Sequence, residues 1–92
     1  TQTNPEETDN LVNMLLRLKG VEIVALCTEH EDVIRINMRA HAPCNAREVA
    51  ARMDGGGHDL AAGCRLCLPM KQALAKLKIE MTAHVESLNS AH

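Results

Sequence analysis

The spacing of hydrophobic residues predicts a helix near the start of the chain. After a linker of residues 1–5, a proline and several acidic residues stand where the first turn of a helix favours them. Leucine and methionine then recur every three or four residues up to Gly20, which is a typical helix end. We therefore expect a helix over residues 6–19.

Two strands are expected next. Residues 21–28 are apolar on both faces of a strand, which favours a central position in a sheet. Residues 33–39 alternate instead, with apolar residues at even positions and Arg35, Asn37 and Arg39 at odd positions. A short polar turn joins the two segments, so the pattern predicts an antiparallel hairpin.

The second half of the chain predicts two more helices and one strand. Asn45 suits a helix N-cap, Glu48 follows three residues later, and this helix ends before Gly55. A short strand around residues 64–68 and a long helix beginning at Pro69 complete the pattern. The order α-β-β-α-β-α separates the second and third strands by a helix and so permits a parallel crossover. We expect an α/β fold in which flanking helices cover a small mixed β-sheet.

Length and composition indicate one globular domain. The chain has 92 residues, of which 46% are hydrophobic and 24% charged. Its apolar runs are far shorter than a membrane-spanning helix needs, and its polar, acidic start does not resemble a signal peptide. We expect a cytoplasmic protein without a membrane partner. Because the chain lacks an initiating methionine, we expect a processed chain or a fragment.

Charge and aromatic content restrict any nucleic-acid ligand. The net charge of −2 argues against tight, sequence-independent binding to duplex DNA, which needs a strongly basic surface. Phe, Tyr and Trp are all absent, so the chain lacks the rings on which single strands usually stack. A nucleic-acid ligand should therefore be short and held by its phosphates.

The segment Gly55-Gly56-Gly57-His58 is the most unusual stretch of the sequence. Three consecutive glycines are entropically costly, which favours a place where side chains would obstruct something. Successive N–H groups in a turn can bind an anion, above all if a helix follows, and His58 would add a donor. A flexible connector with a surface histidine explains these four residues equally well.

A longer motif favours the binding interpretation. Residues 55–63 read GGGHDLAAG and match GGGHxxAAG, the signature of the DHH-associated, substrate-binding C-terminal domain of DHH-family phosphoesterases. The helix over 45–52 resembles the family's helix before the glycines, and the strand over 33–39 resembles its strand ending in S-x-R-S. The segment from residue 7 to 24 resembles the stretch that joins the family's two domains. The chain is most similar to the oligoribonuclease and pAp-phosphatase branch, which includes exopolyphosphatase-related chains.

This resemblance implies a division of labour between two domains. In the family, an N-terminal DHH domain carries manganese and hydrolyses the substrate, while the C-terminal domain holds it. This chain lacks the Asp-His-His metal motif, because no two of its five histidines are adjacent. We therefore expect residues 1–92 to be one substrate-binding domain of a larger enzyme, with no catalytic residue and no metal ligand of its own. The expected partners are that DHH domain and a short RNA or phosphorylated nucleotide such as pAp, with a homodimer as an additional partner.

The resemblance also implies which residues bind. Gly55, Gly56, Gly57 and His58 match the positions that face the phosphate and nucleotide, and Arg39 matches the arginine of the S-x-R-S strand. A guanidinium can hold a phosphate bidentately, although a solvated arginine at a strand end explains Arg39 without a ligand. Two substitutions depart from the motif, because Asn37 and Ala40 stand where the family has serines. The asparagine can still donate a hydrogen bond to a ligand, whereas the alanine cannot.

Three other parent proteins fit the same motif. Within the superfamily, the parent is alternatively a RecJ-like single-strand nuclease or a cyclic dinucleotide phosphodiesterase. From a different class, the domain is alternatively a non-catalytic module for RNA contact or dimerisation, like the related domain of alanyl-tRNA synthetases. The apolar stripe of the last helix is long for a small sheet to cover. The alternative to simple core packing is that part of this stripe packs on the missing domain or on a second copy of the chain.

The remaining sulfur and imidazole groups predict no further site. Cys64 and Cys67 have C-x-x-C spacing, and Cys27 and Cys44 could complete a four-thiolate zinc site. Residues three apart on a strand point to opposite faces, however, so we expect four reduced structural thiols. The other histidines are expected in turns, loops and on helix surfaces, and the five methionines as core residues in place of aromatics. Those histidines are His30, His41, His84 and His92.

Overall fold

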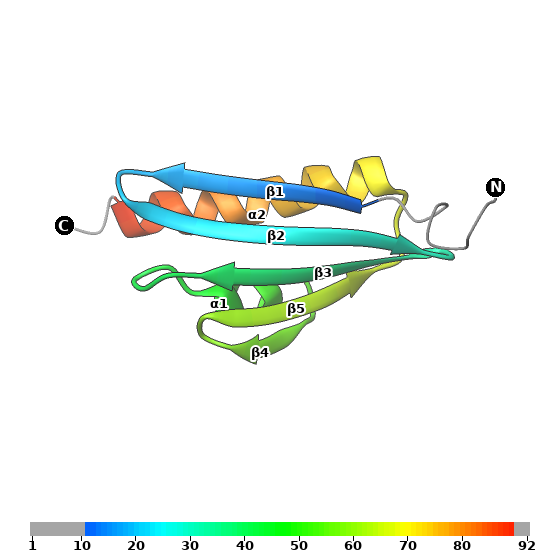
Figure 1. The fold of residues 1–92 in the computed structure, drawn as a ribbon, viewed down its shortest axis with the longest axis horizontal. Helices are drawn as coiled ribbons and strands as arrows, with labels where there is room; N and C mark the ends of the chain where they lie inside the picture. Colours follow the sequence, from blue (N-terminus) through cyan, green and yellow to red (C-terminus); the bar gives the residue numbers. More distant parts are fainter. Residues whose placement is uncertain (1–10, 90–92) are drawn as a thin grey trace.

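The computed structural model describes residues 11–89, which form five strands and two helices (Figure 1). In chain order these are β1 (Leu11–Leu18), β2 (Val21–His30), β3 (Val33–Ala40), α1 (Ala46–Ala51), β4 (Gly56–His58), β5 (Ala61–Leu66) and α2 (Met70–Asn89). The α/β class, with a small sheet covered by helices, is confirmed. The expected element order is wrong, because the described chain runs β-β-β-α-β-β-α.

The segment 11–18 is a strand, so the helix expected over residues 6–19 is wrong there, while residues 6–10 lie outside the described part. It pairs with β2 along its whole length, from Leu11 opposite Thr28 to Leu18 opposite Val21. The two-residue turn between them has positive φ at both Lys19 and Gly20, as a tight hairpin requires. The glycine that resembles a helix end is therefore a hairpin residue.

All strand pairs in the described sheet are antiparallel, in the order β1-β2-β3-β5-β4. The predicted hairpin of β2 and β3 is confirmed. β2 lies inside the sheet, between β1 and β3, but the middle strand is β3 and only one face of β2 is buried. The parallel crossover is wrong, because β5 runs antiparallel to β3. A second hairpin, formed by β4 and β5, accounts for this difference. The chain runs along β4 at the edge of the sheet, in the same direction as β3, and then turns back into β5.

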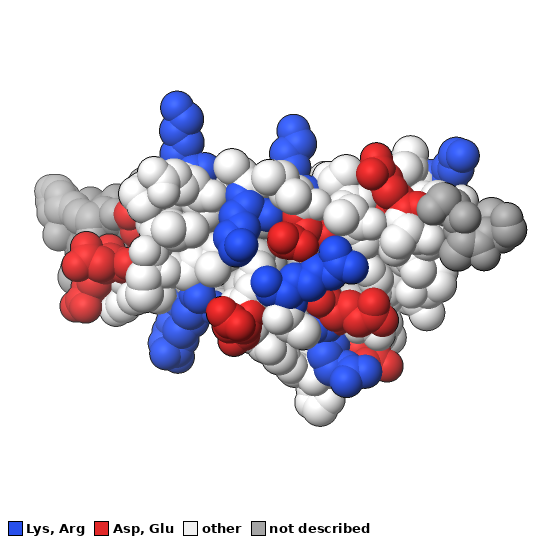
Figure 2. Space-filling view, turned by 180° about the vertical axis from the view of Figure 1, so that it is seen from behind, with Lys and Arg blue, Asp and Glu red and all other residues white. Residues whose placement is uncertain are grey.

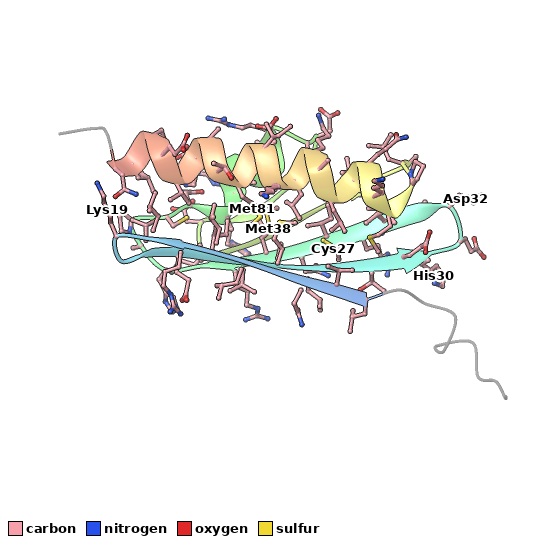
Figure 3. All side chains as sticks on the ribbon, turned by 90° about the horizontal axis from the view of Figure 1, so that it is seen from above. Lys19, Cys27, His30, Asp32, Met38 and Met81 are labelled. Carbon is pink, nitrogen blue, oxygen red and sulfur yellow. The ribbon has the colours of Figure 1, made fainter. Side chains whose placement is uncertain are left out.

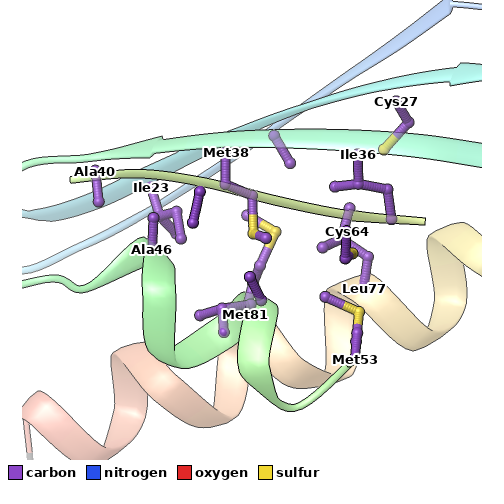
Figure 4. Packing of buried hydrophobic residues seen from close by; sticks show 14 of the residues in the cluster. Ile23, Cys27, Ile36, Met38, Ala40, Ala46, Met53, Cys64, Leu77 and Met81 are labelled. Atoms are coloured by element: carbon purple, nitrogen blue, oxygen red, sulfur yellow. The ribbon is translucent and has the colours of Figure 1, made fainter. Parts of the chain in front are cut away.

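Both helices cover one face of the sheet, and no element of the described chain covers the other, which we call the open face (Figures 1 and 3). Met81 of α2 lies against Met38 of β3, and Cys27 of β2 faces the same layer (Figure 3). The close-up in Figure 4 shows Met53 and Leu77 closing the core below Cys64. Methionines therefore fill the core as expected: three are fully buried, and two are half-buried against it. The buried ones are Met38, Met53 and Met81, and the half-buried ones are Met14 and Met70.

A buried histidine joins the two helices, which corrects the expectation that His84 lies on a helix surface. Only 2% of its surface is exposed, and its Nε2 accepts a hydrogen bond of 2.9 Å from the backbone N–H of Asn45. Asn45 is the N-cap of α1, and its side chain accepts a hydrogen bond from the N–H of Glu48, as the capping pattern predicts. The imidazole of α2 therefore fixes the start of α1.

Candidate functional site

The open face of the sheet brings four of the six predicted site residues together in adjacent rows, whereas Gly57 pairs with the buried Ala62 on the other face and Gly55 lies just before β4. Across the strands, His58 of β4 lies beside Ala61 of β5, which lies beside Arg39 of β3; we call these three the Arg39 row. Gly56, Gly63 and Asn37 follow as the next row, which we call the glycine row. Because paired residues of antiparallel strands share a face, both rows lie on the side that the helices leave uncovered.

The Arg39 row has a gap of suitable size between its two polar residues. Strands in a sheet are spaced by about 4.8 Å, so the Cα atoms of Arg39 and His58 stand roughly 10 Å apart across β5. The residue between them is Ala61, whose side chain is a single methyl group. A guanidinium and an imidazole can therefore reach a phosphate from opposite sides above that alanine.

Gly56 and Gly57 belong to a strand, and Gly55 lies just before it, so the segment is not the anion-binding turn before a helix that its sequence suggested. Two of the three glycines are required by the close packing of β4 on β5. A Cβ at Gly55 would lie 2.2 Å from the carbonyl oxygen of Gly63, and one at Gly57 would lie 2.6 Å from the Cα of Ala62. Gly57 also has a φ of +142°, which L side chains rarely adopt. The close packing of this segment is therefore explained by the chain itself.

Gly56 differs from its neighbours. A Cβ built there meets no atom within 4 Å, and its φ is not in the positive range. Neither packing nor backbone geometry in the described chain therefore requires glycine at this position. Gly56 is exposed and belongs to the glycine row on the open face, so a bare backbone here leaves room for something that approaches from outside.

The turn after His58 is held on both sides, which fixes the position of β4. The carbonyl of Leu60 accepts a hydrogen bond from the N–H of Ala40, and that of Asp59 accepts one from the N–H of Ala46. The helix α1 enters β4 through a Schellman arrangement, in which the N–H of Gly55 donates to the carbonyl of Ala50 over 2.8 Å. These contacts tie the end of β3 and both ends of α1 to the strand that carries His58.

The two departures from the family motif lie on different faces. Asn37 is exposed on the open face, and its Oδ1 lies 3.2 Å from the position of a Cβ at Gly63, so its side chain lies over that glycine. Ala40 is buried, with 7% of its surface exposed. The position that lacks a hydroxyl therefore faces the core, and the one that keeps a polar group faces the open side.

Positive charge is concentrated on the open face, although the chain as a whole is slightly acidic. The strands place four arginines and one glutamate there, a net charge of +3. Arg17 donates to the carboxylate of Glu22 over 3.0 Å and lowers the pKa of that carboxyl. Among the described residues, the other three, Arg35, Arg39 and Arg65, have no ion-pair or hydrogen-bond partner.

The helix-covered face looks different, because Figure 2 shows acidic and basic side chains interspersed over it. Sequence reasoning recognised the polar face of β3 but missed the contribution of β5. The strand was expected over 64–68, whereas it spans Ala61–Leu66. Its true start pairs Ala61 with Arg39 and brings Arg65 opposite Arg35. The only sequence signal for this strand is the alternation of Cys64, Arg65 and Leu66, because Ala61, Ala62 and Gly63 do not differ in polarity.

The cysteines do not form a metal or redox site in the described part of the chain. Cys64 is buried and Cys67 exposed, as expected for opposite directions, and all four thiols are free. Burial raises the pKa of Cys64 to about 11, and the neighbouring Cys27 contributes to this increase. Within residues 11–89, no group of three or more His, Cys, Asp or Glu side chains could hold a metal ion.

None of the described helices is long and apolar enough to span a membrane.

Comparison with known families assigns the chain. Residues 1–86 match the family described as the DHHA1 domain. The chain belongs to the DHHA1 domain family. The expected resemblance is thereby confirmed at the level of the family, and residues 55–63, on which it rested, form β4, the tight turn and the first half of β5 in this DHHA1 domain.

One curated relative is similar over part of this DHHA1 domain. The bifunctional oligoribonuclease and PAP phosphatase NrnA of Thermus thermophilus is 26% identical over 61 residues. Those residues are 66% of this chain and 19% of the relative. The chain therefore matches only a small part of that protein's length.

Proposed function

We propose that this DHHA1 domain is the nucleotide- and phosphate-binding C-terminal domain of a DHH-family phosphoesterase that hydrolyses short oligoribonucleotides or pAp. The observation that carries the proposal is the Arg39 row, in which Arg39 and His58 flank a bare alanine on an uncovered sheet face. A guanidinium and an imidazole in this arrangement suit a phosphate group. The name of the relative, an oligoribonuclease and PAP phosphatase, supports the same class of substrate.

The glycine segment would act as the close-approach surface of this site. Gly56 leaves its part of the open face without a side chain, so sugar or phosphate atoms can lie against the backbone. As an edge strand, β4 also leaves alternate N–H groups outside the sheet ladder, where they can donate to a ligand. Asn37 would add a side-chain hydrogen bond from the adjacent strand.

Hydrolysis would take place in a neighbouring N-terminal DHH domain of the same parent chain. When bound there, manganese would activate water and stabilise the leaving oxygen. The residues of this domain would bind the substrate and orient it toward that centre, and none of them would act as a metal ligand. With three of its four free thiols buried, the domain suits a reducing cytoplasm, which we propose as its location.

The test is an amide NMR titration of the 92-residue chain with pAp and with inorganic phosphate. We expect shifts at Gly55–His58 and Arg39, larger with pAp than with phosphate. Arg39→Gln or His58→Ala should each weaken pAp binding roughly 10-fold, because a charge-assisted hydrogen bond is worth about 1.5–3 kcal/mol. Arg52→Gln is the matched control. It removes one positive charge from α1's C-cap, where Arg52 pairs with Glu80.

Two outcomes would overturn the proposal. If Arg52→Gln weakens pAp binding as much as Arg39→Gln, the effect is one of total charge and not of a site. If an RNA hairpin binds while pAp and dinucleotides do not, the domain is an RNA-contact module of the alanyl-tRNA synthetase kind.

A kinetic experiment uses the parent enzyme. There the double variant Arg39→Ala, His58→Ala should raise the KM for pAp.

A further inference from the structure

A second pair of arginines lies on the open face, beyond the residues that the motif assigns. Arg35 of β3 and Arg65 of β5 are direct register partners, and both are exposed. Like charges directly opposite each other on neighbouring strands are destabilising. Within residues 11–89 neither guanidinium has an ion-pair or hydrogen-bond partner. The sheet thus maintains a costly pair of positive charges without an internal counter-charge, which points to an anion supplied by a ligand.

This pair, which we call the Arg35 row, is aligned with the proposed site. Arg35 and Arg39 are four residues apart on β3, so their Cα atoms are about 13 Å apart along the strand. The glycine row lies between them. An open pocket is lined by Arg35, Asn37, Gly63 and Arg65, and its exposed surface is mostly polar. The two cationic rows are therefore joined by a surface on which two of the three residues are glycines.

No carboxylate of the described strands interrupts this path. Among the described strands, the only acidic residue at an open-face position is Glu22, which lies one row beyond Arg39, outside the path between the two arginine rows, and is ion-paired with Arg17. In register with the Arg35 row, the remaining positions are Thr28 and Leu11, which carry no charge. A polyanion lying along β3 and β5 would therefore meet arginine at both ends and no acidic group between them.

We propose that the Arg35 row binds a second phosphate, so that a phosphodiester chain lies along β3 and β5 over the glycine row. This inference rests on the proposed function of the Arg39 row and specifies its substrate class. The ligand would be an oligonucleotide whose phosphates at the two rows are separated by more than one nucleoside, so pAp, whose two phosphates flank a single nucleoside, reaches only the Arg39 row. A mononucleotide reaches one row only, whereas an oligonucleotide that reaches both is bound at two points. Guanidinium forks suit phosphate oxygens, and two anchors favour oligonucleotides over mononucleotides through effective concentration.

The experiment measures the affinity of the 92-residue chain for AMP and for 5′-phosphorylated oligoadenylates of two to five nucleotides. We expect affinity to rise at least 10-fold between AMP and the four-nucleotide oligomer. The double variant Arg35→Gln, Arg65→Gln should abolish this gain and leave AMP binding unchanged. The matched control, Lys71→Gln with Lys76→Gln, removes two exposed charges from α2 and should preserve the gain. An amide NMR spectrum of each variant verifies its fold.

The outcomes separate the two proposals. If Arg39→Gln weakens every ligand and the double variant weakens none, the second subsite is wrong and the proposed function stands. If Arg39→Gln weakens nothing, the proposed function itself fails. If the double variant weakens AMP and the oligomers equally, the arginines act only through the general field. If an acidic peptide of equal charge binds as tightly as the four-nucleotide oligomer, the nucleotide class is wrong.

Discussion

Gly55, Gly56 and Gly57, at and just before β4, show that one repeated residue type can have different surroundings at adjacent positions. Gly55 and Gly57 are held by contacts with β5, whereas Gly56 has free space at its Cβ position. Sequence alone treats the three alike, because it does not contain the pairing of β4 with β5. It could predict that the segment is special, but not which of the glycines are required by packing.

This difference predicts opposite effects for two alanine substitutions. Gly57→Ala should lower the free energy of unfolding by roughly 1–3 kcal/mol, because it forces a strained φ and a clash with Ala62. Gly56→Ala should change it by less than about 0.5 kcal/mol, because the new methyl group meets only solvent. The same methyl group should nevertheless weaken pAp binding, since it occupies the open face. Urea unfolding and an NMR titration of each variant measure the two effects.

Each variant serves as the control for the other. If Gly56→Ala binds pAp as tightly as the unaltered chain, the ligand does not approach the glycine row. If Gly57→Ala is as stable as the unaltered chain, β4 does not pack on β5 as described.

At the level of the elements, helical and strand periodicity compete in the first segment. Leu11, Leu15 and Leu18 fit a helix, but Val12, Met14 and Leu16 fit a strand equally well. Pairing with β2 decides between them, because it directs the second set toward the core and leaves Leu11 and Leu15 exposed. Long-range pairing of this kind cannot be derived from local spacing, whereas the clean alternation of β3 predicted that strand correctly.

The contact between α2 and α1 predicts a stability change in mild acid. Burial lowers the pKa of His84, Glu48 opposes this shift because it favours the charged imidazole, and Arg52 adds a smaller decrease. The unfolded chain therefore binds a proton that the folded chain resists. The contribution of His84 to stability is full above about pH 6.5, the ordinary value, and declines as the pH falls toward the lowered pKa. Protonation would also remove the acceptor that Asn45 uses.

His84→Gln tests this mechanism, because an amide oxygen can still accept the hydrogen bond but does not titrate. The free energy of unfolding, measured in urea from pH 7.5 to 5, should fall less steeply for this variant than for the unaltered chain. His30→Gln, at the exposed end of β2, is the control and should retain the full slope. Equal slopes for all three proteins would assign the pH dependence to other groups.

For the whole molecule, the distribution of charge is more informative than its sum. The net charge of −2 argued correctly against a uniformly basic surface, but it concealed a sheet face with a net charge of +3. The arginines gather there because two antiparallel strands, distant in sequence, align Arg39, Arg35 and Arg65 on the side that the helices leave uncovered. The unusual glycine segment suggested His58, and the family motif added Arg39. The participation of Arg65 depends on the register of β5, which only the folded chain contains.

This separation of charge predicts that oligonucleotide binding weakens steeply with salt despite the acidic net charge. A ligand contacting the chain through about three phosphates should give a slope of about −2 when log affinity is plotted against log KCl concentration, because each contact on a single strand contributes about −0.7. The double variant Arg35→Gln, Arg65→Gln should have a shallower slope, while Lys71→Gln with Lys76→Gln should leave it unchanged. A slope near zero for the unaltered chain would mean that the phosphates do not lie on the arginine rows. Affinities of the four-nucleotide oligoadenylate, measured between 50 and 300 mM KCl, decide between these outcomes. A slope near −2 would mean that the ligand responds to the local charge of the open face and not to the net charge of the molecule.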